Sequence, residues 1–167
     1  MLKNQDYWIK YLELVPHPEG GFYRRILESG EKITNSTDQK RPLYTSIYFL
    51  LTSKNPSHLH RLKSDEVWYF HQGSPLQIHL INQDGDYKLI KLGNNPEKGE
   101  LLQTLVPKGS IFGSSVNGIN NFSLVSCMVS PGFDYTDFEL FTQQQLLDIY
   151  PAHHELIEKL AFKTIPK

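Results

Sequence analysis

Between residues 43 and 133 the chain consists of short apolar and aromatic runs separated by breaks that contain proline, glycine or asparagine. The runs are Leu43–Thr52, Val67–His71, Leu76–Asn82, Tyr87–Leu92, Leu101–Val106, Ser110–Phe112 and Phe122–Val129. Short runs at roughly 8–12 residue spacing, with no helical pattern between them, indicate an all-β sandwich or barrel. This feature limits the fold more than any other in the sequence.

The two ends of the chain carry helical periodicity instead. Apolar residues recur at helix-like spacing over about 4–14 and again over 142–161, where two short helices are expected. Residues 28–41 are rich in Ser, Thr, Asp, Asn and Lys, which predicts a loop. We therefore expect a single domain over residues 1–167, with its β core at about 20–141.

Charge and cysteine content exclude several classes of protein. The chain has 17 Lys+Arg against 18 Asp+Glu, whereas binding to nucleic acid or a membrane surface through bulk charge favours a basic surplus. A single cysteine, Cys127, excludes a disulfide framework and cysteine-rich zinc sites. The apolar run Ile47–Leu51 is far shorter than the roughly 20 residues of a membrane span. We expect a cytoplasmic protein with neither nucleic acid nor membrane as a partner.

The residues most suited to chemistry lie between positions 58 and 73. His58 and His60 are two positions apart in an extended segment, so their side chains are expected on the same side of a sheet. An acidic pair, Asp65 and Glu66, opens the next strand. Imidazole and carboxylate that converge in a concave space serve either as metal ligands or as a general base with its orienting acid.

Alternation along that next strand places Glu66, Trp68 and Phe70 on one face and Asp65 on the other. If the first face lines the interior, one acidic side chain and two aromatic rings point into it beside one or both histidines. An acidic group inside an aromatic-walled space is typical of a small-molecule site.

These residues also carry a resemblance to a known family. The pattern His58-x-His60-x5-Glu66-x6-Gly73 resembles the first conserved motif of cupins, and Pro107-x-Gly109 resembles the start of the second. The chain further resembles one uncharacterised cupin family, the DUF985-type or Cupin_5 family, which is distantly similar to dTDP-4-dehydrorhamnose 3,5-epimerases. That narrower similarity rests on His17–Arg24, Thr45–Leu51, His60–Trp68, Gln103–Gly109 and Ser130–Asp134.

The resemblance implies a fold and an oligomeric state. Cupins are double-stranded β-helix jelly rolls, so we expect this all-β fold with short helices at the N- and C-termini. Cupins are commonly dimeric, and the aromatic strands around 44–51 and 122–129 are the expected interface of a homodimer.

By analogy with the related epimerases, His60 is the expected base and Glu66 or Asp65 its orienting acid. A tyrosine would donate the proton, and the sequence leaves Tyr23, Tyr48 and Tyr69 open for that role. Arg24 or Arg61 is expected to hold an anionic group through its planar guanidinium.

A metal site is the alternative to this proton chemistry. Its ligands would be His58, His60 and Glu66. However, Phe112 stands where the second cupin motif supplies another ligand histidine, and the amide oxygen of Gln103 is a weak substitute. The sequence requires no cofactor, and a weakly held divalent metal ion stays open.

Three functions follow from these residues. The first is an isomerase or epimerase that acts on a sugar, a nucleotide-sugar or another small carbonyl compound through a His–carboxylate pair. The second is a non-catalytic small-molecule binder in which Trp68, Phe70 and Phe112 stack on a ring and Tyr23 and Gln103 orient it. The third is a divalent-metal cupin enzyme.

Overall fold

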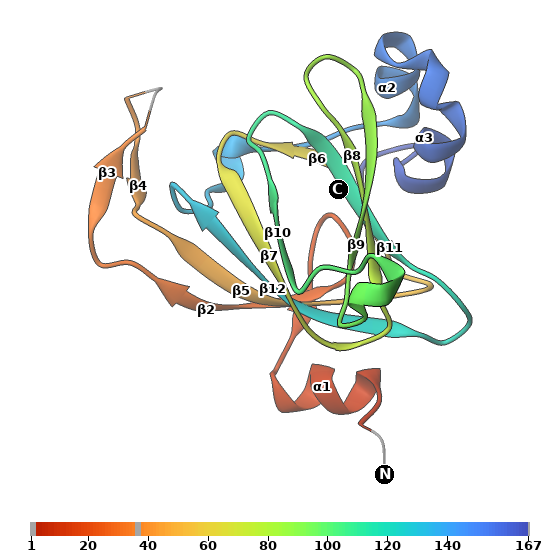
Figure 1. Cartoon of the computed structure of the whole chain (residues 1–167). Helices are drawn as coiled ribbons and strands as arrows, with labels where there is room; N and C mark the ends of the chain where they lie inside the picture. The colour runs from red at the N-terminus through yellow and green to blue at the C-terminus, as the bar shows by residue number, and fades with distance from the viewer. Residues whose placement is uncertain (1–2, 36–37, 167) are drawn as a thin grey trace.

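A computed structural model describes residues 3–35 and 38–166 of the chain. Over these residues the strands form two larger antiparallel sheets that face each other, with a small hairpin beside them (Figure 1). One sheet has six strands in the order β1-β2-β5-β12-β7-β10 and the other has five, β13-β6-β11-β8-β9. The bounds of the strands in the larger sheets are β1 Val15–Pro16, β2 Phe22–Glu28, β5 Thr45–Thr52, β6 Ser57–Leu62, β7 Asp65–Gly73, β8 Leu76–Ile81, β9 Tyr87–Leu92, β10 Gln103–Val106, β11 Ile111–Val116, β12 Phe122–Ser130 and β13 Phe138–Leu140.

The all-β jelly roll expected from the sequence is confirmed, and its core lies between the two sheets. Inward-facing side chains of both sheets form one buried cluster, which includes Phe49, Trp68, Ile78, Phe112 and Val125. Most strands coincide with the apolar runs because alternating apolar positions are what a sheet buried on one face requires. Strands β1, β2, β6 and β13 fall outside these runs.

Short helices cover the outer faces of the sheets. Helix α1 (Gln5–Tyr11) packs against β5 and β12, and it is shorter than expected because the chain turns at Glu13, where φ is 53°. Helices α2 (Gln143–Ile149) and α3 (His154–Leu160) pack on the far side of β6, β8 and β11. The 3₁₀ turns are η1 (Pro96–Lys98), η2 (Tyr135–Asp137) and η3 (Pro151–His153). Among the described residues, no helix has the length and apolar character needed to span a bilayer.

The loop predicted for residues 28–41 is wrong over its described part, because two short strands there pair as a hairpin that extends from the body of the molecule (Figure 1). Residues 36 and 37 of this prediction lie outside the described residues. Strand β3 (Lys32–Thr34) pairs with β4 (Lys40–Pro42). At its base the buried Arg41 donates from Nε to Asp137 Oδ2 of η2 at 2.7 Å. The composition of residues 28–41 could not predict the hairpin, because the ion pair at its base joins residues 96 positions apart.

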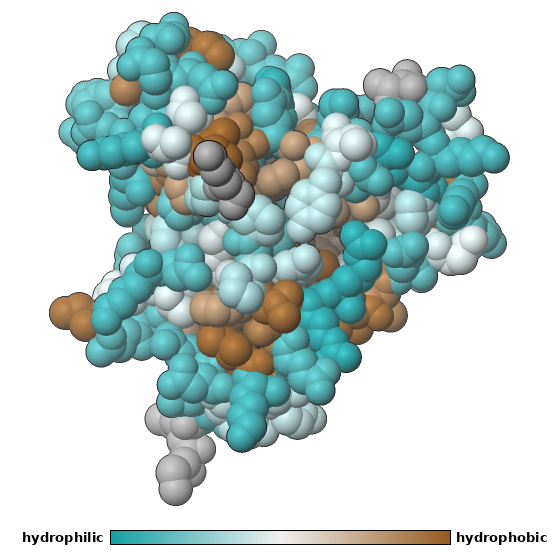
Figure 2. Space-filling view, turned by 180° about the vertical axis from the view of Figure 1, so that it is seen from behind, coloured by the Kyte–Doolittle hydropathy of each residue, from teal (hydrophilic) through white to brown (hydrophobic). Residues whose placement is uncertain are grey.

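The strands expected at a dimer interface lie inside their sheet. Strands β5 and β12 pair with each other and with β2 and β7, whereas the edges of this sheet are β1 and β10. A pairing of two copies through the edges of β5 and β12 is therefore excluded by the sheet order. Seen from behind, apolar side chains reach the surface in separate patches on a largely hydrophilic face (Figure 2).

Candidate functional site

A cavity of about 460 Å³ opens into the space between the two sheets. Its volume lies within the range of roughly 300–1,000 Å³ that is typical of small-molecule sites. The wall combines acids, imidazoles, aromatic rings and aliphatic side chains. These are Glu13, Val15, His17, Glu19, Tyr23, Arg24, Arg25, Thr45, Ile47, Phe49, His60, Leu62, Glu66, Cys127, Val129, Phe133 and Tyr135.

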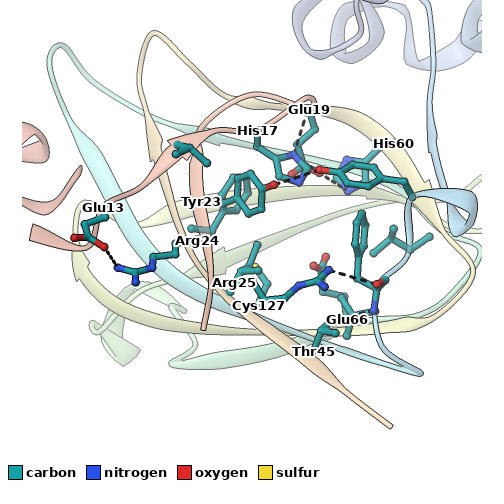
Figure 3. Close-up of a pocket in the computed structure, with 17 residues that line it drawn as sticks. Glu13, His17, Glu19, Tyr23, Arg24, Arg25, Thr45, His60, Glu66 and Cys127 are labelled. Atoms are coloured by element: carbon teal, nitrogen blue, oxygen red, sulfur yellow. Dashed lines mark hydrogen bonds and ion pairs between the residues drawn. The ribbon is translucent and has the colours of Figure 1, made fainter. Parts of the chain in front are cut away.

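Deep in this cavity, Glu19 and two histidines form an imidazole–carboxyl cluster, which consists of His17, Glu19 and His60 (Figure 3). Glu19 Oε2 lies 3.4 Å from His60 Nε2 and 3.6 Å from His17 Nδ1. Glu19 is 6% exposed and His60 is 1% exposed. Burial raises the pKa of Glu19 and lowers the pKa of His60 to about 4, so desolvation disfavours the charged form of each group.

Backbone contacts fix the proton positions in this cluster. His60 Nδ1 lies 2.7 Å from the carbonyl oxygen of His58, which only accepts, so Nδ1 carries the hydrogen. Neutral His60 then presents a lone pair at Nε2 to Glu19. That contact is favourable only if one proton lies between the two groups.

His17 takes a different role, because the backbone N–H of Glu19 donates to His17 Nδ1 at 3.2 Å. Nδ1 is therefore the acceptor and the ring is neutral. The contact of 3.6 Å to the Glu19 carboxyl group is accordingly not an ion pair. Desolvation by burial also lowers the pKa of His17.

A strained turn brings Glu19 into place. Gly20 has φ +110°, and a Cβ atom there would collide with the carbonyl oxygen of Pro56. The close approach allows His58 N–H to donate to the Glu19 carbonyl at 2.7 Å and Ser57 Oγ to donate to Glu19 Oε1 at 2.8 Å. The glycine thus holds the carboxyl group in one orientation against β6.

A second buried acid, Glu66 of β7, lies across the cavity from this cluster, on the wall that also carries Cys127 (Figure 3). Glu66 Oε2 accepts a hydrogen bond of 2.9 Å from the indole Nε1–H of Trp68. Burial, with a smaller contribution from the nearby Glu19, raises the pKa of Glu66 to about 8. Glu66 is therefore largely protonated at neutral pH. Burial also raises the pKa of Cys127, which keeps this thiol protonated.

Aromatic rings and one guanidinium group surround the mouth of the cavity. The hydroxyl groups of Tyr23 from β2 and Tyr135 from η2 lie 3.4 Å apart. The Arg25 guanidinium reaches from β2 towards the carbonyl oxygen of Phe133, at 3.5 Å, and pairs with Glu28 at 2.9 Å. The mouth thus offers ring faces and hydroxyl groups together with a cation.

His58 does not join His60 in the cavity. The pairing of β11 with β6 shifts register between Phe112 and Ser114, which breaks the alternation of β6 next to His58. The His58 ring instead stacks on Phe162 with 3.7 Å between centroids, and its Nδ1 contacts the Glu19 carbonyl at 2.7 Å. The expected ligand set of His58, His60 and Glu66 is therefore not brought together. Over residues 3–35 and 38–166, no three His, Cys, Asp or Glu side chains converge to hold a metal ion.

Strand alternation decides which of the remaining predicted acids and tyrosines line the cavity. Glu66 faces inwards as expected, but Asp65 faces the surface, where its Oδ1 accepts from the backbone N–H of Lys108 at 2.8 Å. Tyr48 lies on the outer face of β5 beside His71, so it does not line the cavity. Tyr23 is the candidate tyrosine that does line it, whereas Tyr69 borders an outer groove.

The aromatic residues expected to stack on a ligand form the core instead. Trp68 and Phe112 are each 1% exposed, and Phe112 packs on His60 with 4.1 Å between ring centroids. Phe70 packs against the core, and together with Gln103 it borders a second groove beside β7 and β10. The rings that line the cavity are Tyr23, Phe49, Phe133 and Tyr135.

The arginine predictions also change. Arg24 lies at the rim, where it pairs with Glu13 (Figure 3). Arg61 pairs with Glu139 on the outer surface. Arg25 is the arginine on the inward face of β2, because it is opposite Ile47 in the register and two positions from Tyr23. The same alternation was readable in the sequence once Tyr23 was known to face inwards. The approach of His17 and Glu19 to His60 had no comparable local signal.

Two facing antiparallel sheets around this polar cavity define a cupin-type small-molecule protein. The chain belongs to the Cupin_5 family, described as cupin superfamily (DUF985), whose model matches residues 6–141. It is similar to a solved hypothetical protein from Leishmania major, with 49% identity, a TM-score of 0.92, and coverage of 95% of this chain and 99% of that one. The solved protein SO0799 from Shewanella oneidensis is 48% identical, with a TM-score of 0.91 and coverage of 98% and 100%. The uncharacterized protein YML079W of Saccharomyces cerevisiae is 30% identical over 139 residues, which cover 75% of this chain and 69% of that protein.

Proposed function

We propose that this protein is an isomerase or epimerase that moves a proton on a sugar or another small carbonyl compound. The geometry that supports this proposal is the approach of Glu19 Oε2 to His60 Nε2 at 3.4 Å, in an open cavity that has the protonated Glu66 on its opposite wall. One wall thus holds a group that exchanges a proton, and the other holds an acid. Proton transfer next to a carbonyl group needs both.

The reaction can be written with its protons balanced. The Glu19–His60 pair takes a proton from the carbon next to the substrate carbonyl, so the C–H bond breaks and its electrons form a C=C bond. The carbonyl oxygen takes the Glu66 proton, which gives a neutral enol. The Glu19–His60 pair then returns its proton to carbon while an enol O–H returns a proton to Glu66. This restores the carbonyl group in an isomeric or epimeric product and regenerates the protein.

The buried environment supports this use of uncharged groups. His60, Glu19 and Glu66 are each less than 9% exposed, so a bound ligand would meet them with little intervening water. In such a site a hydrogen bond from the protonated Glu66 to a developing oxyanion is stronger than it would be in water. The metal alternative has less support, because the lone pair of His60 already faces Glu19 and, over the described residues, no three His, Cys, Asp or Glu side chains converge to hold an ion.

The test is exchange of carbon-bound hydrogen in D₂O, followed by proton NMR over a panel of aldoses, ketoses and their phosphates. Glu19→Gln retains a hydrogen-bond donor towards His60 and an acceptor for Ser57 but lacks the transferable proton. We expect exchange to fall by about 10²–10⁴-fold in this variant. Exchange on no member of the panel, together with tight binding of one, would favour the non-catalytic binder instead.

The control is Glu139→Gln, which removes an exposed carboxylate paired with Arg61 on the outer surface. This variant should exchange as the wild type does. Equal rates in Glu19→Gln and the wild type would contradict the proposal, provided that both proteins unfold at the same urea concentration.

A further inference from the structure

The mouth of the cavity carries one inward-facing guanidinium group, and the proposed function leaves it unused. Arg25 shares the inner face of β2 with Tyr23, and its side chain is 44% exposed. Its contacts are with Glu28 Oε2 at 2.9 Å and the Phe133 carbonyl oxygen at 3.5 Å. A guanidinium group has five N–H donors in a planar fork, so these two contacts leave donors for a ligand.

The existing partner of Arg25 is one that a ligand can replace. The Glu28 side chain is 48% exposed, and an ion pair between two half-exposed groups has little net stability. The bond to Phe133 is at the long limit of hydrogen bonding. An anion at the mouth would therefore gain two charge-assisted hydrogen bonds for the loss of weak ones.

The cavity has a charged guanidinium group at its mouth, whereas burial disfavours charge on the side chains at its floor. The acids and imidazoles of the floor are buried, and desolvation disfavours their charged forms, as described above. A charged ligand group there would lose its hydration without a fixed countercharge, which is costly. A neutral, hydroxyl- or carbonyl-bearing end fits the floor, whereas an anionic end fits the mouth.

We propose that Arg25 binds the phosphate or carboxylate of the substrate, so that the ligand is a small polyhydroxy carbonyl compound with one anionic end at the mouth. This inference rests on the proposed function for the placement of the carbonyl group. The rings of Tyr23, Phe133 and Tyr135 would contact the carbon skeleton between the two ends.

Binding of three probes tests this inference by isothermal titration calorimetry. Glucose 6-phosphate and glucuronate carry the two kinds of anion, and glucose carries neither. The anionic probe that fits should bind at least tenfold more tightly than glucose, and Arg25→Gln should remove that advantage. Preference for one anionic probe over the other identifies phosphate or carboxylate as the natural group.

Three further variants make the test specific to the mouth. Arg61→Gln is the matched control, because Arg61 is 43% exposed and pairs with a carboxylate on the outer surface. Glu28→Gln removes the competing carboxylate, so it should tighten binding of the anionic probe severalfold. Arg25→Lys keeps the charge without the fork and should retain only part of the affinity.

Two outcomes would overturn the anion site: anionic probes that bind no better than glucose, or equal losses in Arg25→Gln and Arg61→Gln. These outcomes are separate from those of the exchange experiment. Anion-dependent binding without hydrogen exchange would leave the Arg25 site standing and remove the isomerase proposal. Hydrogen exchange on neutral sugars that is unchanged in Arg25→Gln would support the isomerase proposal and count against the Arg25 anion site.

Discussion

Glu19 Oε2 lies 3.4 Å from His60 Nε2, and the other ring nitrogen of His60 lies 2.7 Å from the His58 carbonyl oxygen. Glu19 comes from the turn before β2 and His60 from β6 of the opposite sheet. The contact therefore joins two sheets at the floor of the cavity. The acid beside His60 is therefore Glu19, whereas the sequence predicted Glu66 or Asp65 in that position.

Titration of the imidazole groups should reveal the buried His60. Because desolvation lowers the pKa of His60 to about 4, its ring is expected to stay neutral at pH 6, with the hydrogen on Nδ1. Long-range ¹H–¹⁵N correlation spectra distinguish the two neutral tautomers and the imidazolium ion. A cationic ring at pH 6, or a hydrogen on Nε2 alone, would contradict the assigned proton positions.

Stability should depend on pH through Glu66. Its pKa rises from 4.5 to about 8 on folding, so the folded state binds this proton more tightly than the unfolded chain does. The contribution of Glu66 to the free energy of unfolding is complete below pH 4.5 and is lost as the pH rises to about 8. Glu66→Gln avoids that loss, so its stability relative to the wild type should increase across this interval by on the order of a few kcal/mol.

Urea unfolding at several pH values measures this difference. Asp65→Asn is the matched control, since it removes the neighbouring carboxylate from the exposed face of the same strand. A pH-independent difference between Glu66→Gln and the wild type would mean that Glu66 is ionised in the folded protein at neutral pH.

The turn at Gly20 should be sensitive to a single methyl group. Gly20→Ala places a Cβ against the Pro56 carbonyl oxygen at φ +110°, so we expect a loss of about 2–4 kcal/mol in stability and a displaced Glu19. Gly30→Ala is the control, because a Cβ there meets nothing within 4 Å. Thermal unfolding of both variants checks the prediction, and equal midpoints would show that the turn relaxes freely.

Homodimer formation stays a prediction, and we now expect it at the β10 edge because β5 and β12 lie inside their sheet. Leu102 and Leu105 are 66% and 48% exposed at the β10 edge, where unpaired backbone groups favour association. Light scattering should give twice the 19.3 kDa of the chain, and Leu105→Glu should shift the protein towards monomer. Ile119→Glu, at an 87% exposed position outside this edge, should leave the mass unchanged. A wild-type mass of 19.3 kDa, that of one chain, would contradict the predicted homodimer.

Much of the fold was predictable from the sequence because burial of one sheet face imposes a period of two. The same rule correctly placed Glu66 inwards and Asp65 outwards. It failed at His58, where a register shift between β11 and β6 breaks the period. A shift of this kind depends on the neighbouring strand, so the sequence of β6 alone does not encode it.

The sequence by itself determined the jelly roll, the family and the inward acid on β7, and it indicated His60 as a candidate site residue. Those features follow from local alternation and from motifs within a single stretch of chain. Only the tertiary structure decided which groups His60 meets, which arginine faces the mouth and which rings line the cavity. These depend on turns and registers that bring distant segments within 3–4 Å, where a shift of one residue would turn each side chain to the opposite face.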